Sequence, residues 1–382
     1  MDQRKMKTQP LPGITCSADR ILAEVSHGIY ITDLERRIVY WNKAAEKITG
    51  WQAHEVVGSS CADNILRHTD KDGRELCGKE SCPLHRAMVT GSGSTVPSLV
   101  FAGKKGGGER LPMQVSVAPV LDGQGAIIGG VEIFQDLSRQ MGDMDRARQI
   151  QELSMSMPVN DDPRLRWASY YAAHDIVGGD YYMAERIDQD RYAFLIADVM
   201  GHGVAAALYS MHLHSLWERN RRLLERPATF MTTLNRNLCQ LVRDGESFAT
   251  CLFGLIDLGA QAVALCSAGS PAILLTRGDE TRQIKMSGLP LGMMPETIYE
   301  VSLIPLASGD GLLFFTDGAM EIRDTGGATL GSDGLASLVN AHGFPDSEEK
   351  MQNLVEKMLL YSNDIRFSDD VAMLAVRCLT GT

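Results

Sequence analysis

The sequence predicts an α+β protein in which a small N-terminal domain and a larger layered domain are joined by one helix. Short strand patterns separated by turn residues fill the first third of the chain, and a polar stretch with helical spacing follows them. Apolar strands then alternate with amphipathic helices towards the C-terminus. Strands and helices in that mixture bury their apolar faces by forming layers, with helices covering paired sheets.

The composition is that of a globular protein with room for two or three domains. The chain has 382 residues, 44% of them hydrophobic and 22% charged, with a formal net charge of −11. The acidic surplus argues against a nucleic-acid partner, and no apolar run approaches the roughly 18 residues of a membrane helix. The basic start lacks the apolar stretch of a secretory signal, and the eight cysteines form no dense framework. We therefore expect a cytoplasmic protein.

Changes of pattern divide the chain into four parts. We expect a flexible N-terminus at 1–18, a small α+β domain at 19–137, a connector helix at 138–157 and a C-terminal domain at 158–382. The predicted elements of the small domain are a helix at 19–25, strands at 28–33 and 37–42, a helix at 43–49, and strands at 111–118 and 126–134. Asn42 is expected to cap the second helix, and Gly50 is expected to end it.

The order strand, strand, short helices and hairpin resembles the PAS sensor fold. The stretch from Tyr40 to Gly50, YWNKAAEKITG, is similar to the signature of that family. PAS domains sense small ligands, redox state or protein partners, and they commonly dimerise. The resemblance therefore implies a sensor in residues 19–137, with a ligand that the sequence does not name.

Three cysteines in this domain form a separate group of candidate ligands. Cys61, Cys77 and Cys82 lie near His68 and His85, and such residues can hold zinc or a cluster, or form a redox pair. A metal or redox group at these three cysteines is one interpretation. The other is that they are small buried residues, because no CxxC pair is present.

The connector helix carries one apolar face. Its members recur at steps of three or four residues and are Met141, Met144, Ala147, Ile150 and Leu153. A stripe of this kind indicates pairing with the same helix of a second copy, which would make the protein a homodimer. A solvated helix in a monomer is the alternative, because the repeat is short and imperfect.

The C-terminal domain alternates strands with helices. Its predicted strands cover residues 165–171, 192–197, 248–257, 262–267, 272–275, 299–304, 312–316 and 371–376. Its predicted helices cover residues 204–224, a segment opened by Pro227, and residues 347–361 with Asp346 as the cap. Two helices between strands are typical of a sandwich in which helices cover paired sheets.

Acidic residues stand at four strand ends that are far apart in the sequence. They are Asp180 behind two glycines, Asp198 after a buried strand, Asp317 in Thr-Asp-Gly, and the pair Asp369 and Asp370. One such residue alone is most simply a turn or cap residue. Carboxylates that converge repel one another, and a divalent cation is the usual remedy, with oxygen ligands favouring Mg²⁺ or Mn²⁺. Two such ions can share a water, lower its pKa and direct it at phosphorus.

Six motifs follow one another in a characteristic order. They are Gly178-Gly-Asp-Tyr-Tyr182, Asp198-Val-Met-Gly-His-Gly203, Cys266-Ser-Ala-Gly269, Gly288-Leu-Pro-Leu-Gly292, Thr316-Asp-Gly318 and Asp369-Asp370. In order and spacing they resemble the bacterial SpoIIE-type serine phosphatases, which belong to the metal-dependent PPM protein phosphatases. The resemblance covers roughly residues 158–378. It implies the family's αββα sandwich, with metals in the cleft between the sheets.

Carried over residue by residue, the resemblance assigns the metal site. The residues that match the family's catalytic metal carboxylates are Asp180, Asp198, Asp317 and Asp369. Asp198 would bridge two Mn²⁺ or Mg²⁺ ions. The backbone carbonyl of Val199 matches a further ligand, with Gly201 as its rival, and Asp370 stays open as an alternative to Asp369.

His202 follows the metal turn and is a candidate general acid. We favour a turn residue hydrogen-bonded to backbone, because no carboxylate lies beside it in the sequence. The chemistry requires no cysteine or serine nucleophile, and Cys266 is expected to be buried.

The resemblance implies a phosphoserine or phosphothreonine protein phosphatase that the PAS domain regulates. Close members of the family act on phosphorylated anti-sigma-factor antagonists of the STAS type, so such a phosphoprotein is the expected partner. The helices after Gly203 resemble the family's switch element, which moves the metal-bearing turn when a regulatory domain docks. Neither a nucleic-acid nor a membrane partner is expected.

Three residues depart from the family's pattern. Met183 stands where an acidic residue is frequent, Ser270 where histidine is frequent, and Met200 where a small residue is common. The alternative function is therefore a PAS-dimer signalling scaffold whose phosphatase-like domain is weak or inactive and binds a partner. The four metal carboxylates are all present, which favours the enzyme. A nucleotide-binding transducer is disfavoured, because the sequence has no Walker-type phosphate loop.

Overall fold

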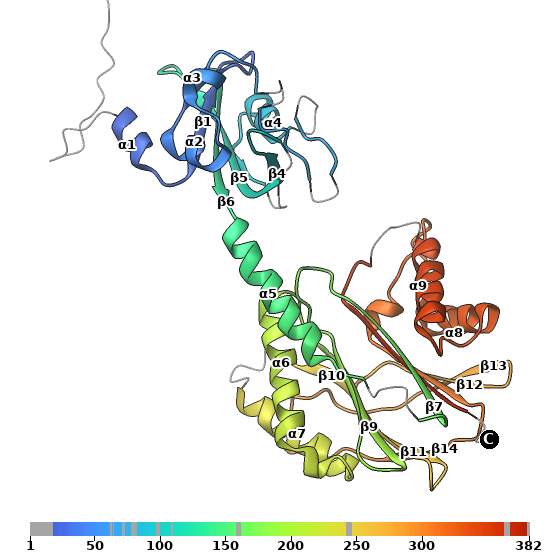
Figure 1. The fold of residues 1–382 in the computed structure, drawn as a ribbon. Coiled ribbons are helices and arrows are strands. Elements are labelled where there is room, and N and C mark those ends of the chain that lie inside the picture. Colours follow the sequence, from blue (N-terminus) through green and yellow to red (C-terminus); the bar gives the residue numbers. More distant parts are fainter. Residues whose placement is uncertain are drawn as a thin grey trace, which may run out of the picture. The chain divides into compact units, whose positions relative to one another are not determined.

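The computed structural model describes residues 18–61, 63, 65–70, 73–77, 82–96, 100–107, 110–157, 162–241, 247–362 and 367–379. The chain divides into two compact units, Met1–Asp143 and Met144–Thr382 (Figure 1). Helix α5, Ser138–Ser154, begins in the first unit and ends in the second.

The first unit is built on an antiparallel sheet with the order β2-β1-β6-β5-β3, and β4 lies beside β5. Its elements are α1 Ala18–Glu24, β1 Gly28–Thr32, β2 Ile38–Trp41, α2 Lys43–Thr49, α3 Ala53–Val56, α4 Pro83–Thr90, β3 Ser94–Thr95, β4 Val100–Gly103, β5 Arg110–Leu121 and β6 Ile127–Asp136. Successive side chains of a strand point to opposite faces, so Met113, Val115 and Val117 of β5 all enter the core.

The predicted cap of helix α2 is confirmed. The Asn42 side chain accepts hydrogen bonds from the N–H of Ala45 at 2.8 Å and of Ile29 at 3.0 Å, and it donates to the His27 carbonyl at 2.9 Å. Gly50 follows the helix with a φ of +78°, a left-handed conformation that glycine adopts without a Cβ clash. Local signals in the sequence therefore define both ends of this helix.

The second unit stacks two antiparallel sheets, with the strand orders β14-β11-β10-β9-β8 and β13-β12-β15-β16-β7. The strands are β7 Leu165–Ala172, β8 Tyr181–Arg186, β9 Arg191–Val199, β10 Ala249–Asp257, β11 Ala262–Ala268, β12 Ile273–Arg277, β13 Glu280–Ile284, β14 Ser302–Pro305, β15 Gly311–Phe315 and β16 Val371–Cys378. The helices are α6 Val204–Arg219, α7 Pro227–Leu241, α8 Gly331–His342 and α9 Glu348–Ser362, with 3-10 turns η1 Arg221–Leu223 and η2 Asp317–Ala319.

Helices cover both outer faces of the paired sheets. Figure 1 shows α6 and α7 on one side of the strands and α8 and α9 on the other. Under α6 and α7, the ring of Phe230 lies 4.7 Å from that of Phe253 on β10. Between the sheets, the rings of Phe194 and Phe314 lie 4.4 Å apart. These layers form the expected αββα sandwich, so the predicted fold class is confirmed.

Some predicted bounds in the second unit are wrong. The helix expected at 204–224 ends at Arg219, where the Asn220 side chain donates to the Leu216 carbonyl at 2.8 Å and so competes with the helical ladder. The strand expected from residue 299 begins only at Ser302, and α8 was not predicted. Among the described residues, no helix combines the length and the apolar character that crossing a bilayer requires.

Asp346 does not cap α9 as predicted. Its carboxylate accepts instead from the Lys350 ammonium at 2.7 Å and from the Arg377 guanidinium at 3.3 Å. The Ser347 hydroxyl accepts from the backbone N–H of Lys350 at 3.3 Å. The cap position is therefore one residue later, because two cations hold the aspartate.

The C-terminal half of α5 presents its part of the apolar stripe to solvent, whereas Met141 and Met144 are half-buried. The side chains of Ile150 and Leu153 are 60% and 84% exposed. The neighbouring polar residues Gln151 and Ser154 are buried instead, at 1% and 8% exposure. Helix α5 therefore packs on the second unit through a polar face.

Replacing Phe253 by alanine would remove a fully buried ring that packs on Phe230 and Trp217. We expect the free energy of unfolding to fall by about 3–5 kcal/mol, because the site cannot fully collapse. Urea unfolding measures the change, with Leu303→Ala, at a 73% exposed position, as the control. Equal stability of the two variants would contradict the assigned core.

Candidate functional site

Two of the predicted acids occupy neighbouring places at one end of the sheet that contains β8 and β9. The two strands pair with Tyr181 opposite Ala197. Asp180 comes just before β8, and Asp198 lies near the end of β9. The antiparallel register therefore brings these two residues, 18 positions apart in the sequence, to adjacent strand ends.

The other two acids lie at one end of the second sheet. Phe315 at the end of β15 pairs with Met373 near the start of β16. Asp317 follows β15, and Asp369 precedes β16 by two residues. The same kind of register thus joins two acidic turns that are far apart in the sequence.

Hydrogen bonds connect the two sheet ends. The Thr316 hydroxyl donates to the Asp180 carboxylate at 2.6 Å, and the N–H of Gly179 donates to the Asp370 carboxylate at 2.6 Å. The N–H of His174 donates to the other oxygen of Asp370 at 2.7 Å. The first two bonds link a residue beside one sheet to a residue beside the other, whereas His174 follows β7, the neighbour of β16 in the same sheet. The acidic turns of both sheets therefore meet at one place.

Burial and like charge both act against ionisation of these acids. Burial, followed by the charge of Asp198, raises the pKa of Asp180 well above its ordinary value. Burial, followed by the charges of Asp317 and Asp369, raises the pKa of Asp198 to about 7. Burial, followed by the charge of Glu321, also raises the pKa of Asp317. A divalent cation would counter the repulsion, and a set of oxygen donors fits Mg²⁺ or Mn²⁺.

Two glycines let the backbone approach the acidic turns closely. A Cβ on Gly178 would lie 2.7 Å from the carboxylate of Asp370. A Cβ on Gly179 would lie 2.6 Å from the carbonyl oxygen of Val199 and 3.3 Å from that of Gly201. Both candidate carbonyl ligands therefore border Gly179, and only glycine fits there.

The two neighbouring aspartates before β16 have different environments. Asp370 is buried, and both of its carboxylate oxygens accept backbone N–H groups, as described above. Asp369 is exposed, and one of its oxygens accepts the N–H of Asp370 at 2.8 Å. Asp370 is thus occupied in holding the Gly179 turn, whereas Asp369 keeps an oxygen available.

The converging acids do not form a ready set of metal ligands in the part of the chain that the structure describes. Among the described residues of both units, no three His, Cys, Asp or Glu side chains are arranged as a ready metal-ligand group. The assignment of Asp180, Asp198, Asp317 and Asp369 as metal ligands therefore stays a prediction. The raised pKa values and the glycine contacts are what support it.

The interpretation of Cys61, Cys77 and Cys82 as a metal group has no support in the structure. Cys82 is buried, Cys61 and Cys77 are half-buried, and all three are free thiols. Burial raises the pKa of Cys61 and of Cys77 to about 12. Protonated thiols are poor ligands and poor nucleophiles. Their environment is that of small core residues.

His202 has a partner that its sequence neighbours do not reveal. Its Nδ1 lies 2.8 Å from the Asp175 carboxylate, and both side chains are exposed. The ring centroid of His174 lies 6.4 Å from that of His202. The expected backbone partner is therefore wrong. Asp175 and His174 were missed because they stand 27 and 28 residues before His202 in a loop without a recognisable pattern.

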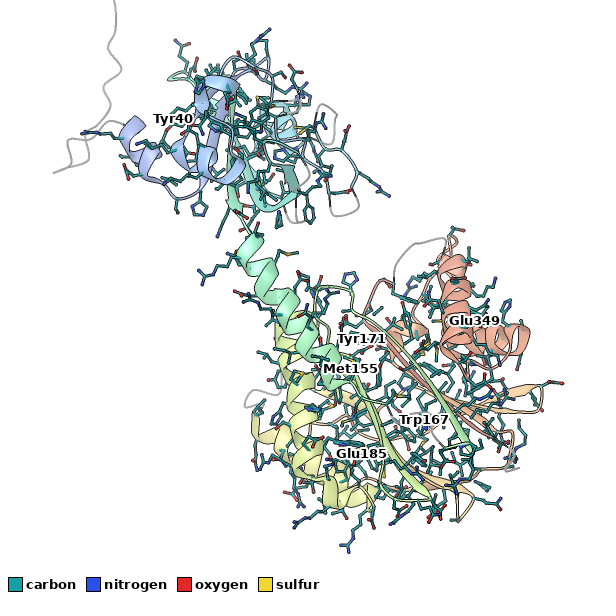
Figure 2. The ribbon with its side chains drawn as sticks, in the orientation of Figure 1. Tyr40, Met155, Trp167, Tyr171, Glu185 and Glu349 are labelled. Carbon is teal, nitrogen blue, oxygen red and sulfur yellow. The ribbon has the colours of Figure 1, made fainter. Side chains whose placement is uncertain are left out.

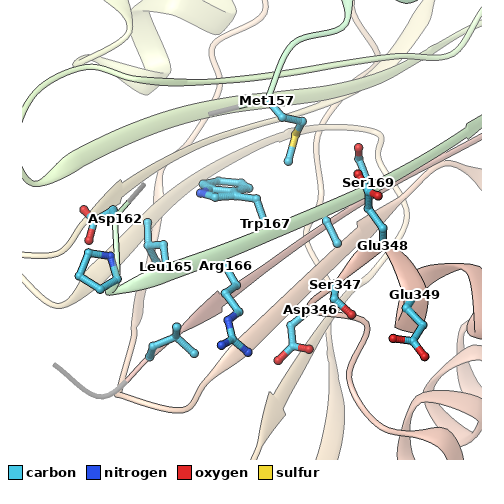
Figure 3. Close-up of a pocket in the computed structure, with 13 residues that line it drawn as sticks. Met157, Asp162, Leu165, Arg166, Trp167, Ser169, Asp346, Ser347, Glu348 and Glu349 are labelled. Carbon is cyan, nitrogen blue, oxygen red and sulfur yellow. The ribbon is translucent and has the colours of Figure 1, made fainter. Parts of the chain in front are cut away.

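A large cavity lies away from the predicted acids. It has a volume of about 900 Å³ and follows β7 and the start of α9, with Arg166, Trp167 and Glu348 among its lining residues (Figure 3). A cavity of about 380 Å³ lies between α5 and the loop after β7, and Tyr171 and Asp175 line it. The smaller cavity is the nearer one to the acidic turns, because Asp175 also binds His202 beside Asp198.

Models of two protein families match the chain in succession. The family described as "Stage II sporulation protein E (SpoIIE)" matches residues 188–379, and the "PAS fold" matches residues 22–141. The chain is 32% identical to phosphoserine phosphatase RsbP of Bacillus subtilis over 183 residues, which cover 47% of this chain and 45% of RsbP. It is 25% identical to phosphoserine phosphatase RsbU of the same organism over 237 residues, which cover 62% of this chain and 70% of RsbU. The match thus spans about half the length of RsbP.

Solved structures show the same fold at low sequence identity. The SiaA-PP2C domain of Pseudomonas aeruginosa matches with a TM-score of 0.56 and 22% identity, covering 63% of this chain and 97% of that domain. The PP2C phosphatase domain of SpoIIE from Bacillus subtilis, with a fragment of its regulatory domain, matches with a TM-score of 0.51 and 22% identity, covering 70% of this chain and 71% of that one. Because the SpoIIE match spans half of the sequence and a PAS match precedes it, the chain belongs to the SpoIIE family of PPM phosphatases and carries an N-terminal PAS domain.

Proposed function

We propose that the chain is a metal-dependent protein phosphatase that hydrolyses phosphoserine or phosphothreonine. The observation that carries the proposal is the meeting of acidic turns from both sheets, joined by the hydrogen bond from Thr316 to Asp180. The names of the relatives RsbP and RsbU, both phosphoserine phosphatases, support the reaction type.

The ions would be held by carboxylates from both sheets. The proposed ligands are Asp180, Asp198, Asp317 and Asp369, together with the carbonyl of Val199 or of Gly201. When bound, Mn²⁺ or Mg²⁺ lowers the pKa of a water and offsets the charge of the transferring phosphoryl group. The chain's own residues orient the ligands: Thr316 holds Asp180, and Asp370 holds the Gly179 turn.

The substrate we propose is a phosphorylated anti-sigma-factor antagonist of the STAS type, as the family resemblance implies. The domain limits proposed from the sequence, a PAS sensor at 19–137, a connector at 138–157 and a phosphatase domain at 158–382, give the enzyme a regulatory segment before its catalytic one. We also propose a homodimer. Its support is the exposed stripe of α5, where Ile150 and Leu153 present apolar surface that a second copy of the same helix could cover.

The first prediction concerns catalysis. The protein should hydrolyse an aryl phosphate with Mn²⁺, and Asp198→Asn and Asp317→Asn should lower the rate at least about 100-fold, because each removes a metal carboxylate. Asp279→Asn, at an exposed turn between β12 and β13, is the matched control and should be unchanged. A folded wild type without activity would favour the signalling scaffold.

The second prediction concerns the metal-free protein. The pKa of Asp198 is about 7 in the folded state against an ordinary value of 3.8. Between these values the folded state keeps a proton that the unfolded state loses, so wild-type stability falls as pH rises through this window. Asp198→Asn lacks this titration. The variant should therefore melt at a higher temperature than wild type in EDTA, by a margin that grows from pH 5 to pH 7.5.

Differential scanning fluorimetry at the two pH values measures this margin. Addition of Mn²⁺ should raise the melting temperature of wild type and leave that of Asp198→Asn nearly unchanged. A margin that is constant with pH would show that Asp198 does not carry the raised pKa.

The third prediction concerns regulation. Deleting residues 1–137 should change the rate severalfold without abolishing Mn²⁺-dependent hydrolysis, because the proposed ligands all lie in the second unit. Steady-state kinetics of the full chain and the truncated chain make the comparison. An unchanged rate and an unchanged metal dependence would speak against coupling between sensor and phosphatase.

A further inference from the structure

One polar side chain of the connector helix is buried in the second unit. Gln151 is 1% exposed, although its neighbour Ile150 in the last turns of α5 is 60% exposed. A buried carboxamide needs partners for two N–H donors and for its oxygen. Every one of these requirements is met by a residue outside α5.

The carboxamide of Gln151 binds both backbone polar groups of Gly178, its N–H and its carbonyl. Its Nε2 donates to the carbonyl of Gly178 at 2.6 Å, and its Oε1 accepts the N–H of Gly178 at 3.3 Å. The Tyr171 hydroxyl donates to the same Oε1 at 3.3 Å, and Figure 2 shows Tyr171 beside the C-terminal half of α5. Gln151 thus binds Gly178 as a neighbouring strand would.

Gly178 is part of the turn that carries a proposed metal ligand. It stands two residues before Asp180 and packs against the carboxylate of Asp370, with no space for a Cβ. At the next residue, Gly179, a Cβ would lie 2.6 Å from the carbonyl oxygen of Val199. A shift of the Gly178 peptide would therefore displace Asp180 and the backbone beside Asp198.

The remaining donor of Gln151 reaches helix α6. Nε2 also donates to the Ser210 hydroxyl at 2.8 Å, and that hydroxyl donates to the Ala207 carbonyl at 2.9 Å. Ser210 is fully buried. Helix α6 begins at Val204, directly after the short turn that contains Gly201 and follows Asp198 at the end of β9. One side chain therefore binds both segments that flank the proposed metal centre.

We propose that Gln151 is a positioning residue for the proposed metal centre: it fixes the Gly178 turn relative to helix α6, and so holds Asp180 and Asp198 where both could bind metal. This inference rests on the proposed function. A role confined to packing α5 on the domain would make Gln151 important for stability and leave metal affinity unaltered. A substitution of Gln151 therefore distinguishes the two roles by its effect on Mn²⁺ affinity, because both roles predict a lower melting temperature.

The test compares Gln151→Met with Gln149→Met in the full chain. Methionine has a similar length and no amide, and Gln149 is an exposed glutamine of the same helix. Isothermal titration with MnCl₂ measures binding directly, and the Mn²⁺ dependence of aryl phosphate hydrolysis gives a second readout. We expect Gln151→Met to bind Mn²⁺ about 10-fold or more weakly than Gln149→Met, as for other residues that orient metal ligands.

Equal Mn²⁺ affinity of the two folded variants would overturn the positioning role and leave the proposed function intact. A wild type that binds no Mn²⁺ would overturn the proposed function, and the positioning role with it. If Gln151→Met does not melt cooperatively, Ser210→Ala, which removes one acceptor, takes its place. A weaker Mn²⁺ affinity of Ser210→Ala then supports the role, and wild-type affinity overturns it.

Discussion

The second unit depends on a contact between two sheets that each end in acidic turns. Thr316 makes that contact: its hydroxyl donates to Asp180 at 2.6 Å and accepts the N–H of Ala372 at 2.9 Å, and its own N–H donates to the Ala372 carbonyl at 3.1 Å. Thr316 thus extends the pairing of β15 with β16 by one residue and also binds Asp180, the acid before β8. This bond opposes the repulsion that would otherwise separate the carboxylates.

The acidic turns differ from the other buried carboxylates of the unit. Asp310 is also almost fully buried, yet it pairs with the Arg277 guanidinium at 2.6 Å. Burial acts to raise the pKa of Asp310, but the hydrogen bonds from Arg277 outweigh it and lower the pKa. At Asp180 and Asp198 burial raises the pKa and the neighbouring carboxylates raise it further. Buried acids placed among like charges lower stability, which is typical of residues kept for binding or chemistry.

Helix ends and the layer architecture could be predicted from the sequence, because helix ends depend on nearby residues and the architecture is implied by an ordered set of motifs. Asn42 and Gly50 bound their helix through contacts within a few residues, and the ordered motifs indicated the αββα layers. Other features arise from tertiary contacts with no local signal. The pairing of His202 with Asp175 requires the loop after β7 to lie beside the turn after β9. No sequence pattern marks Gln151, since its partners Gly178, Tyr171 and Ser210 lie in other segments.

The hydrogen bonds between Gln151 and Gly178 require one particular rotation of α5 about its own axis. Successive residues of an α-helix are about 100° apart around the axis. Turning α5 by one such step would remove the carboxamide from Gly178 and bring a hydrocarbon such as that of Ile150, which offers a peptide group no partner. Rotation of the N-terminal end of this helix would therefore break the hydrogen bonds of Gln151 to the Gly178 turn. The turn would lose these bonds in one step and would not bend gradually.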